Sequence, residues 1–209
     1  MFITIEGIEG GGKTTQVGLL AAALERAKLV VRVTREPGGT KLGEEIRSLL
    51  LHSATSVGGL AELFLILADR AQHVESLIQP ALRAGEVVLC DRFADSTLAY
   101  QAYGRELPLE AVRAVESVAR QGVLPDLTFV LDCPIEIGLA RTRRRRGHAA
   151  ADRFEGEEAS FHERVRQGFL ALAREDPRRI RVIDGTRAAD DVHREILAWS
   201  AEKLGVRTP

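Results

Sequence analysis

The sequence is poor in aromatic residues and in cysteine, and it has no long apolar run. Two Tyr, one Trp and seven Phe make up only 5% of the 209 residues, and there are two cysteines. Without an apolar stretch of about 20 residues, no membrane-spanning helix is predicted. An apolar, strand-like run begins directly after Met1, which leaves no room for a signal peptide there. We therefore expect a cytoplasmic protein that does not associate with membranes.

The two cysteines, Cys90 and Cys133, both sit in apolar, strand-like runs. Neither has the spacing of a metal-binding or redox pair, so we expect two reduced thiols in the core. Charge is nearly balanced, with a formal net charge of −1. A chain with so little net charge has no general attraction to nucleic acid. The hydrophobic content of 45% suffices for one domain with a full core over residues 1–209.

The chemistry begins in residues 2–15, where a short apolar run is followed by Gly7-x-x-x-x-Gly12-Lys13-Thr14. Glycines let the chain curl so that its N–H groups point at a polyphosphate, and a following helix presents its positive end. Lys13 can then reach the β- and γ-phosphates, and the Thr14 hydroxyl can hold Mg²⁺. A glycine-rich turn could fit the pattern by chance, but the strand before and the helix after favour nucleotide binding. The predicted ATP-binding residues are Gly7, Ile8, Glu9, Gly10, Gly11, Gly12, Lys13, Thr14 and Thr15.

Strand-like and helix-like segments alternate along the rest of the chain. Such alternation predicts an α/β fold with a parallel sheet covered on both faces, and a ligand site at the carboxyl edge of the strands. Strands are expected at 2–5, 29–33, 86–91, 127–132 and 179–184. Helices are expected from the glycine-rich loop to 27 and at 42–51, 60–84, 108–121, 135–146, 161–174 and 190–204, with another starting near 92.

Charged residues follow the predicted strand ends. Arg35 follows the second strand, Asp91 and Arg92 the third, and Asp132 the fourth. Arg35 could simply pair with Glu36, and Asp91 could be a helix cap. We favour Asp91 as the second ligand of a Mg²⁺ ion, with Asp132 as the competing acid.

A run of arginines follows the fourth strand. Arginine binds phosphate through a planar fork, so several arginines at a sheet edge suggest transfer between two phosphorylated molecules. The run could also be a solvated helix end or an RNA patch, but no aromatic residues interleave it. We favour a lid, at about residues 142–156, that closes over the transferring group. The arginines concerned are Arg141, Arg143, Arg144, Arg145, Arg146 and Arg153.

Taken together, these segments resemble the thymidylate kinase family over nearly the whole chain. The glycine-rich P-loop of residues 7–15 alone indicates only nucleotide binding, whereas the second and fourth of the following segments together are specific to the family. The matching segments are 5–15 (IEGIEGGGKTT), 34–40 (TREPGGT), 69–73 (DRAQH), 91–101 (DRFADSTLAYQ), 131–134 (LDCP) and 152–155 (DRFE).

The resemblance implies a three-layer P-loop nucleoside monophosphate kinase fold with a five-stranded parallel sheet. It implies the reaction ATP + dTMP → ADP + dTDP with Mg²⁺ held by Thr14 and Asp91, and a homodimer. A different nucleoside monophosphate is the nearest alternative acceptor. Arg70 and Tyr100 distinguish the two readings, since another acceptor would need neither.

The resemblance also implies residue roles around the acceptor dTMP. Arg35 and Arg92 would hold its phosphate, and Arg70 would hydrogen-bond a thymine carbonyl. Glu9 would face the 3′-hydroxyl, and Tyr100 would occupy the place of a ribose 2′-hydroxyl. The residues expected around the base and sugar are Ser96, Thr97 and Gln101.

The P-loop carries no arginine at its variable positions, whereas the lid is rich in them. This is similar to the bacterial variant of the family, in which a lid arginine stabilises the charge on the transferring group after closure. We select Arg143 and Arg153 for that role. With Lys13, Asp91 and Arg92 they make up the predicted catalytic residues.

One position departs from the family pattern. Many members have a phenylalanine four residues before the equivalent of Arg70, stacked on thymine, and here that position is Ile66. Phe64 lies about 200° round the helix from it and cannot substitute. Ile66 still covers the base but lacks the aromatic term of about 0.5–1.5 kcal/mol.

Overall fold

The computed structural model describes residues 1–52, 56–147 and 153–206, apart from the side chain of Arg146. The middle of the predicted lid, residues 148–152, lies outside the described residues. Asp152 of the sixth family segment lies outside them as well.

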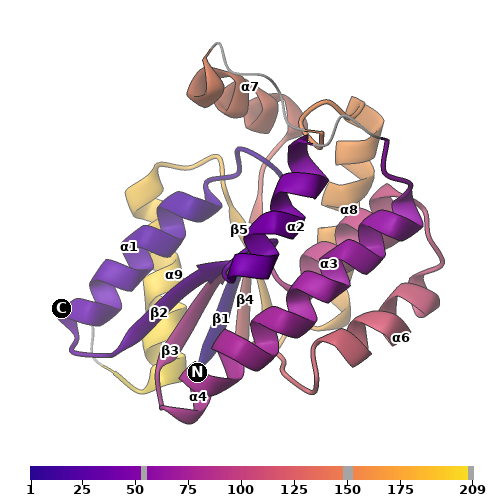
Figure 1. Ribbon diagram of the computed structural model, residues 1–209. Helices are drawn as coiled ribbons and strands as arrows, with labels where there is room; N and C mark the ends of the chain where they lie inside the picture. Colours follow the sequence, from indigo (N-terminus) through magenta and orange to yellow (C-terminus); the bar gives the residue numbers. More distant parts are fainter. Residues whose placement is uncertain (53–55, 148–152, 207–209) are drawn as a thin grey trace.

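Five parallel strands form one sheet in the order β2-β3-β1-β4-β5 (Figure 1). Together with the flanking helices, this sheet confirms the predicted α/β class. All five residues of β1 are buried, because it lies at the centre of the sheet and is covered on both faces. The strands are β1 (Phe2–Glu6), β2 (Val31–Arg35), β3 (Val87–Asp91), β4 (Leu127–Asp132) and β5 (Ile180–Asp184).

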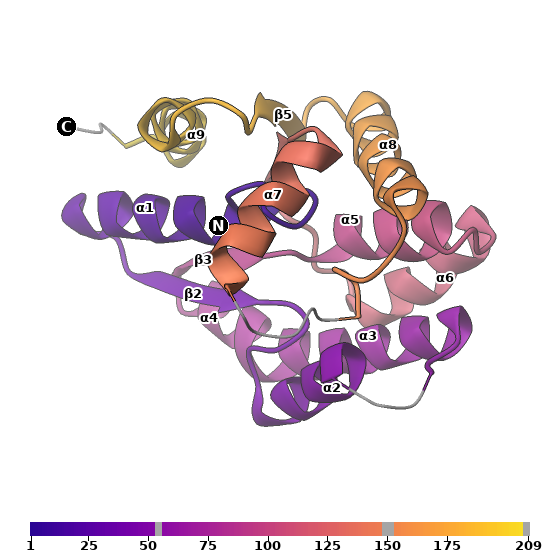
Figure 2. The same ribbon diagram turned by 90° about the horizontal axis from the view of Figure 1, so that it is seen from above.

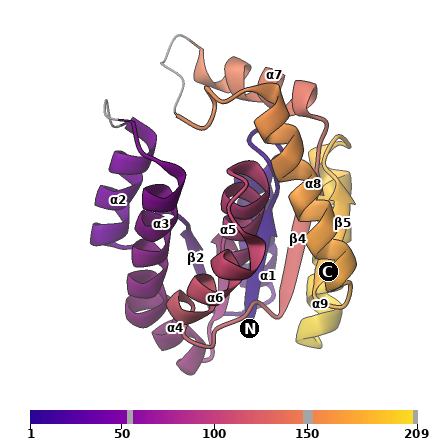
Figure 3. The ribbon, with the colours of Figure 1, turned by 90° about the vertical axis from the view of Figure 1, so that its right-hand side faces the viewer.

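Helices cover the sheet in two outer layers, as Figures 2 and 3 show. One face packs on α1 and α9 through apolar side chains such as Leu20 and Ile196. The other face packs on the elements from α3 to α8, with Val74 and Phe93 in its core. The helices are α1 (Lys13–Arg26), α2 (Lys41–His52), α3 (Gly59–His73), the π-helical turn η1 (Val74–Ile78), α4 (Gln79–Arg83), α5 (Ala94–Thr97), the π-helical segment η2 (Leu98–Gly104), α6 (Leu109–Ala119), α7 (Ile135–Arg146), α8 (Ala159–Glu175) and α9 (Ala189–Leu204).

Two helical predictions need correction. The segment 60–84 is helical throughout, but its middle widens into the π-helical turn η1 before Pro80. Proline has no N–H and its ring crowds the carbonyl four residues earlier, so a regular α-helix cannot pass through it. The helix predicted to start near Arg92 begins at Ala94 instead, because Arg92 has a left-handed backbone with φ of 72°.

The second strand is shifted by two residues, from the predicted 29–33 to Val31–Arg35. Arg35 is therefore its last residue and pairs in register with Asp91, the last residue of β3. In the same way Asp132 is paired with Asp184 at the ends of β4 and β5. The sheet thus collects charged side chains along its carboxyl edge, over which α7 lies in Figure 1. None of the described helices combines the length and the apolar character that a membrane crossing needs.

Candidate active site

A cavity of about 590 Å³ opens at the carboxyl edge of β1, β2 and β3. Fifteen of the predicted site residues line it, and they come from the P-loop, α1, β2, α3, β3, α5 and η2 as well as the loops between them. These residues are Glu9, Gly10, Gly12, Lys13, Thr14, Thr15, Arg35, Ile66, Arg70, Asp91, Arg92, Ser96, Thr97, Tyr100 and Gln101. Gly7, Ile8 and Gly11 belong to the same loop without lining the cavity.

The P-loop glycines are required by their backbone and by the close approach of other segments. Gly7 has φ of 130°, and a Cβ there would lie 2.6 Å from the Leu131 carbonyl oxygen of β4. Gly10 has φ of 73°, and a Cβ there would lie 2.1 Å from the Gly138 carbonyl oxygen in the first turn of α7. Any side chain at either position would therefore displace the loop.

Lys13 begins α1 and turns its amine back over the loop. Its Nζ donates a hydrogen bond of 2.7 Å to the Ile8 carbonyl oxygen. Burial and, to a smaller extent, the nearby Arg92 cation lower the pKa of Lys13 to about 8, against the opposing charge of Asp91. A phosphate placed in this loop would add negative charge beside the amine and favour its protonated form.

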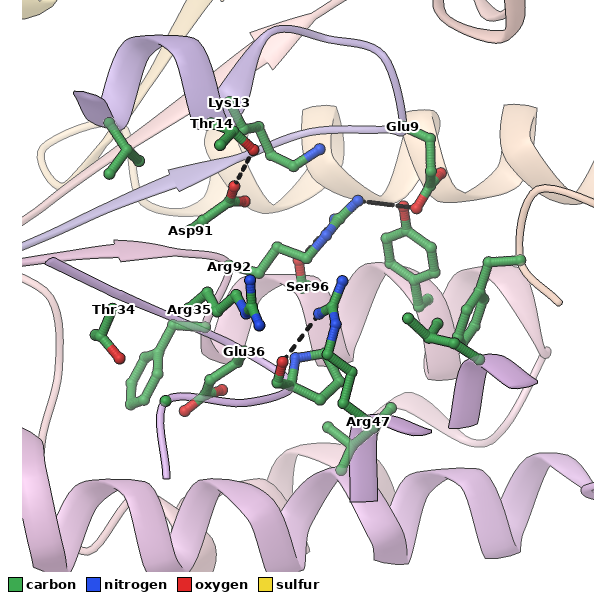
Figure 4. Close-up of a pocket in the computed structure, with 18 of the residues that line it drawn as sticks. Glu9, Lys13, Thr14, Thr34, Arg35, Glu36, Arg47, Asp91, Arg92 and Ser96 are labelled. Carbon is green, nitrogen blue, oxygen red and sulfur yellow. Dashed lines mark hydrogen bonds and ion pairs between the residues drawn. The ribbon is translucent and has the colours of Figure 1, made fainter. Parts of the chain in front are cut away.

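Thr14 and Asp91 meet across the carboxyl edge, where the Thr14 hydroxyl donates a 2.7 Å hydrogen bond to Asp91 Oδ2 (Figure 4). A hydroxyl and a carboxylate are the hard oxygen ligands that Mg²⁺ prefers, so this pair could hold the ion. The competing acid, Asp132, is already engaged, because Arg166 of α8 donates to both of its oxygens at 2.6 and 2.9 Å. The geometry therefore favours Asp91 over Asp132 as a metal ligand.

Arg92 makes four side-chain hydrogen bonds on the acceptor side, the part of the cavity where the acceptor dTMP is expected. Its left-handed backbone turns the side chain back over the P-loop, where Nη1 donates to the Gly7 carbonyl oxygen at 2.9 Å. Nη1 also donates to Ser96 Oγ at 3.1 Å, and Nη2 donates to Glu9 Oε1 and the Tyr100 hydroxyl oxygen at 2.9 and 3.0 Å. The guanidinium also lies over the Tyr100 ring. Ser96 and Tyr100 lie four and eight residues after Arg92 in the sequence, whereas Gly7 and Glu9 come from the distant P-loop.

Glu9 connects the P-loop to the acceptor side. The Tyr100 hydroxyl donates to Glu9 Oε1 at 2.6 Å. Burial would raise the pKa of Glu9, but the Arg92 and Lys13 cations outweigh burial and hold it below the usual value. Among the described residues, Glu9 Oε2 accepts no hydrogen bond, and the buried His162 Nδ1 lies 3.6 Å away. Sequence reasoning missed His162, since no local pattern places a residue of α8 beside the P-loop.

Arg70 of α3 is held by a buried carboxylate. Its Nε and Nη2 donate to Glu36 Oε2 at 2.9 and 2.7 Å. Its Nη1 lies 3.5 Å from Glu116 Oε1, and neither of these two atoms makes a hydrogen bond within the described residues. The guanidinium lies over the Phe93 ring, and only 1% of the side chain is exposed. The contacts of Arg70 with Glu36 and Glu116 were not predicted from the sequence.

Two further arginines, Arg35 and Arg47, line the cavity across from Lys13 and Glu9 (Figure 4). Arg35 Nη2 donates to both oxygens of Glu44 at 2.9 Å, rather than pairing with its neighbour Glu36. Arg47 of α2 donates from Nη1 to the Pro37 carbonyl oxygen at 2.9 Å. Sequence reasoning missed Arg47, although its place three residues after Glu44 on a helix puts both on one face.

The lid arginines separate into three environments. Arg145 of α7 lines the main cavity and also a neighbouring cavity of about 270 Å³ beside the P-loop. Arg143 lines neither within the described part of the lid. Arg153 donates to the Leu50 and Val57 carbonyl oxygens at 3.0 Å and contacts Glu62. These contacts join the base of the lid to α2, through Leu50, and to α3, through Glu62.

Comparison with known proteins identifies the family. The sequence model of the thymidylate kinase family matches residues 5–196. The chain is 52% identical to a thymidylate kinase of Desulfovibrio desulfuricans, covering 92% of this chain and 91% of that one. It is 50% identical to a thymidylate kinase of Halothermothrix orenii, with 94% of each covered.

A solved structure agrees with the sequence comparisons. The crystal structure of thymidylate kinase from Ehrlichia chaffeensis superposes with a TM-score of 0.77 at 36% identity, covering 96% of this chain and 98% of that one. The five-stranded parallel sheet with flanking helices is thus the P-loop nucleoside monophosphate kinase fold. The chain belongs to the thymidylate kinase family, a family of ATP-dependent nucleoside monophosphate kinases.

Proposed function

We propose that the cavity binds ATP and dTMP facing each other and transfers the γ-phosphoryl group to dTMP, giving ADP and dTDP. The observation that carries this proposal is that the P-loop and three arginines, Arg35, Arg47 and Arg92, line one cavity. Lys13 and the loop N–H groups would hold the donor phosphates, in the residue set predicted from the sequence.

Thr14 and Asp91 would hold the Mg²⁺ ion that accompanies ATP. Their direct hydrogen bond of 2.7 Å, at the mouth of the P-loop, supports this role. The ion would neutralise charge on the donor phosphates. The chain's own contribution is to fix both oxygen ligands on rigid elements, the first turn of α1 and the end of β3.

The acceptor phosphate would lie among three arginines, Arg35, Arg47 and Arg92. Arg35 and Arg47 now contact Glu44 and a carbonyl oxygen, partners that a dianionic phosphate can replace. Arg92 is already oriented by four hydrogen bonds, so little ordering remains when the phosphate binds.

The nucleoside would extend from this phosphate toward α3. The Nη1 group of Arg70 has no hydrogen-bond partner among the described residues, which suits it to donate to a thymine carbonyl. Ile66 would cover the base, and Glu9 with Tyr100 would face the sugar. Ser96, Thr97 and Gln101 complete the proposed acceptor site.

The lid, at about residues 142–156, would supply the last cation after closure. Arg143 and Arg153 remain proposals from the family resemblance. We add Arg145, because it lines both the main cavity and the smaller one beside the P-loop. A cation that arrives only on closure would stabilise the transferring group and limit hydrolysis of ATP.

The test is ADP release with dTMP, dUMP, dCMP, UMP and AMP as acceptors. We expect kcat/KM to be higher for dTMP than for UMP and AMP, because Arg70 meets a carbonyl on thymine and Tyr100 disfavours a ribose. A clear preference for a ribonucleotide, or negligible turnover of dTMP, would contradict the proposed acceptor site.

Homodimerisation and a cytoplasmic location are further proposals. Leu60 and Phe64 are one helical turn apart on α3 and are 56% and 55% exposed. Such an apolar pair on a surface helix supports packing against a second copy of the chain. Light scattering of the purified protein would show a dimer mass, and a monomer at micromolar concentration would refute it.

A further inference from the structure

The last residue of β1, Glu6, carries a buried carboxyl group directly beneath Arg92. Its side chain is entirely buried between the sheet and α5. Glu6 Oε1 accepts a 2.7 Å hydrogen bond from the Phe93 backbone N–H, and Glu6 Oε2 lies 2.5 Å from the Ser96 hydroxyl oxygen. The carboxyl group therefore joins β1 to the loop that carries Arg92, through Phe93, and to α5, through Ser96.

These two contacts fix the Arg92 backbone and side chain. The Arg92 N–H donates to the Ile5 carbonyl oxygen at 3.1 Å, and the next N–H, of Phe93, donates to Glu6. Two successive N–H groups are thus held by β1 on the carboxyl side of β3. This supports the left-handed conformation of Arg92, which is unfavourable for a residue with a Cβ.

The side chains continue the connection. Ser96 Oγ accepts from Arg92 Nη1 at 3.1 Å and donates to Glu6 Oε2. A hydroxyl that donates to a carboxyl oxygen and accepts from a guanidinium links the two side chains, and its single donor is used. Glu6 therefore holds both the backbone and the side chain of Arg92, although Glu6 itself does not line the cavity.

We propose that Glu6 is a positioning residue for acceptor binding, which holds Arg92 in its phosphate-binding orientation through the Phe93 N–H and the Ser96 hydroxyl. The inference rests on the proposed role of Arg92. Fold stability alone does not account for an acid at this position, because burying a carboxyl group is costly and Phe2, on the same face of β1, packs in an apolar core with Phe93.

Other charged groups around Glu6 have partners of their own. Asp95 of α5 is paired with Arg179, which donates to both of its oxygens at 2.6 and 2.9 Å. Arg92 is the cation that Glu6 reaches through Ser96, and Lys13 of α1 is held by the Ile8 carbonyl oxygen. Glu6 is thus connected to the acceptor side rather than to the structural ion pair of α5.

The test is a graded series at Glu6 with steady-state kinetics at pH 9, where the Glu6 carboxyl group of the parent is ionised. Glu6→Gln keeps an oxygen for the Phe93 N–H but removes the acceptor of the Ser96 hydroxyl, whereas Glu6→Leu removes both. We expect KM for dTMP to rise about fivefold in the first variant and more in the second, as loss of one and two hydrogen bonds predicts. KM for ATP should stay within twofold of the parent.

Thr4→Val is the matched control. Thr4 lies two residues earlier on β1, on the same face, and is fully buried with its hydroxyl 2.8 Å from that of Thr128. We expect a lower Tm with unchanged KM for dTMP. An equal rise of KM in this variant would overturn the proposal, because it would trace the effect to general loosening of β1.

Two more variants complete the design. Ser96→Ala combined with Glu6→Gln should raise KM for dTMP by less than the product of the single effects, since both act through one connection.

Arg92→Ala tests the proposed function itself, and unchanged KM for dTMP in that variant would refute both ideas. If Arg92→Ala raises KM while folded Glu6→Gln does not, only the role of Glu6 is refuted. Should Glu6→Leu fail to fold, Glu6→Gln and the double variant decide.

Discussion

At the scale of single residues, the cavity is lined by arginines that acidic side chains hold in place. Arg92 is bound by Glu9, Arg70 by Glu36 and Arg35 by Glu44. The first two pairs are largely or fully buried, and the third is about half exposed. Screening by water makes the Arg35 pair weak, so a phosphate can displace Glu44 at little cost. The buried pairs instead keep Arg92 and Arg70 oriented before the substrate binds.

The low pKa of Lys13 leads to a prediction for ATP binding. A lysine with a pKa of about 8 loses its cation as pH rises through 8, and with it the attraction for the donor phosphates. We expect Kd for ATP, measured by calorimetry, to increase between pH 8 and pH 9.5 by up to about tenfold per unit. Lys13→Arg stays charged in this range, so its weaker binding should be independent of pH. An equal slope in both proteins would contradict the assignment.

Ile66 offers a gain-of-function prediction. Ile66 lines the cavity beside Arg70, whereas Phe64 on the same helix is 55% exposed. A phenylalanine at 66 would add ring stacking on thymine of about 0.5–1.5 kcal/mol, so Ile66→Phe should lower KM for dTMP about two- to tenfold. The control Phe64→Leu should leave KM unchanged. An increased KM for Ile66→Phe would mean that the base does not lie against this position.

At the scale of elements, the sequence predicts what repeats locally and misses what distant segments decide. The P-loop was predictable because a strand, a glycine pattern and a helix occur in one stretch. The gathering of charged residues at the strand ends was predictable because the carboxyl ends of parallel strands share an edge. Arg92 was expected in a helix, but Ile5 and Glu6 of β1 hold it in a left-handed turn. The pairing of Glu36 with Arg70 was missed, as were Arg47 and His162, since their partners lie on other elements.

The contact between the P-loop and α7 gives a prediction at this scale. Gly10 touches Gly138 so closely that a Cβ would lie 2.1 Å from its carbonyl oxygen. Gly10→Ala should displace the loop or the first turn of α7 and weaken ATP binding by at least about tenfold. Gly18→Ala is the matched control, because Gly18 lies within α1 with nothing within 4 Å of a new Cβ. It should keep full affinity and gain about 0.5–1 kcal/mol of stability from helix propensity. Normal ATP affinity in Gly10→Ala would show that the packing is not required.

At the scale of the whole molecule, the central strand carries both the fold and the site. β1 is hydrogen-bonded to β3 and β4, ends in Glu6, and leads directly into the P-loop. Its carboxyl end therefore reaches the donor side through the loop and the acceptor side through Glu6. Function at this edge requires buried polar groups, and these make the fold less stable than an apolar sheet end would.

The burial of the Glu6 carboxyl group predicts how the free energy of unfolding depends on pH. Burial, aided by Asp95, raises the pKa of Glu6 to about 8 from the 4.5 of an ordinary glutamate. Between those two values the folded chain keeps a proton that the unfolded chain releases, so the free energy of unfolding falls as pH rises. The maximum slope for one group is about 1.4 kcal/mol per pH unit, and it ends once Glu6 ionises in the folded state as well.

Glu6→Gln cannot ionise and should lack this contribution. Urea unfolding at pH 5.5, 6.5, 7.5 and 9 should show the variant gaining on the parent with each step up to about pH 8, with a constant difference beyond. Asp69, whose pKa burial raises to about 7, remains in both proteins and cancels in the comparison. A stability difference that does not change with pH would mean that Glu6 ionises normally in the folded protein. A growing difference together with an increased KM for dTMP would show that the same carboxyl group lowers stability and supports acceptor binding.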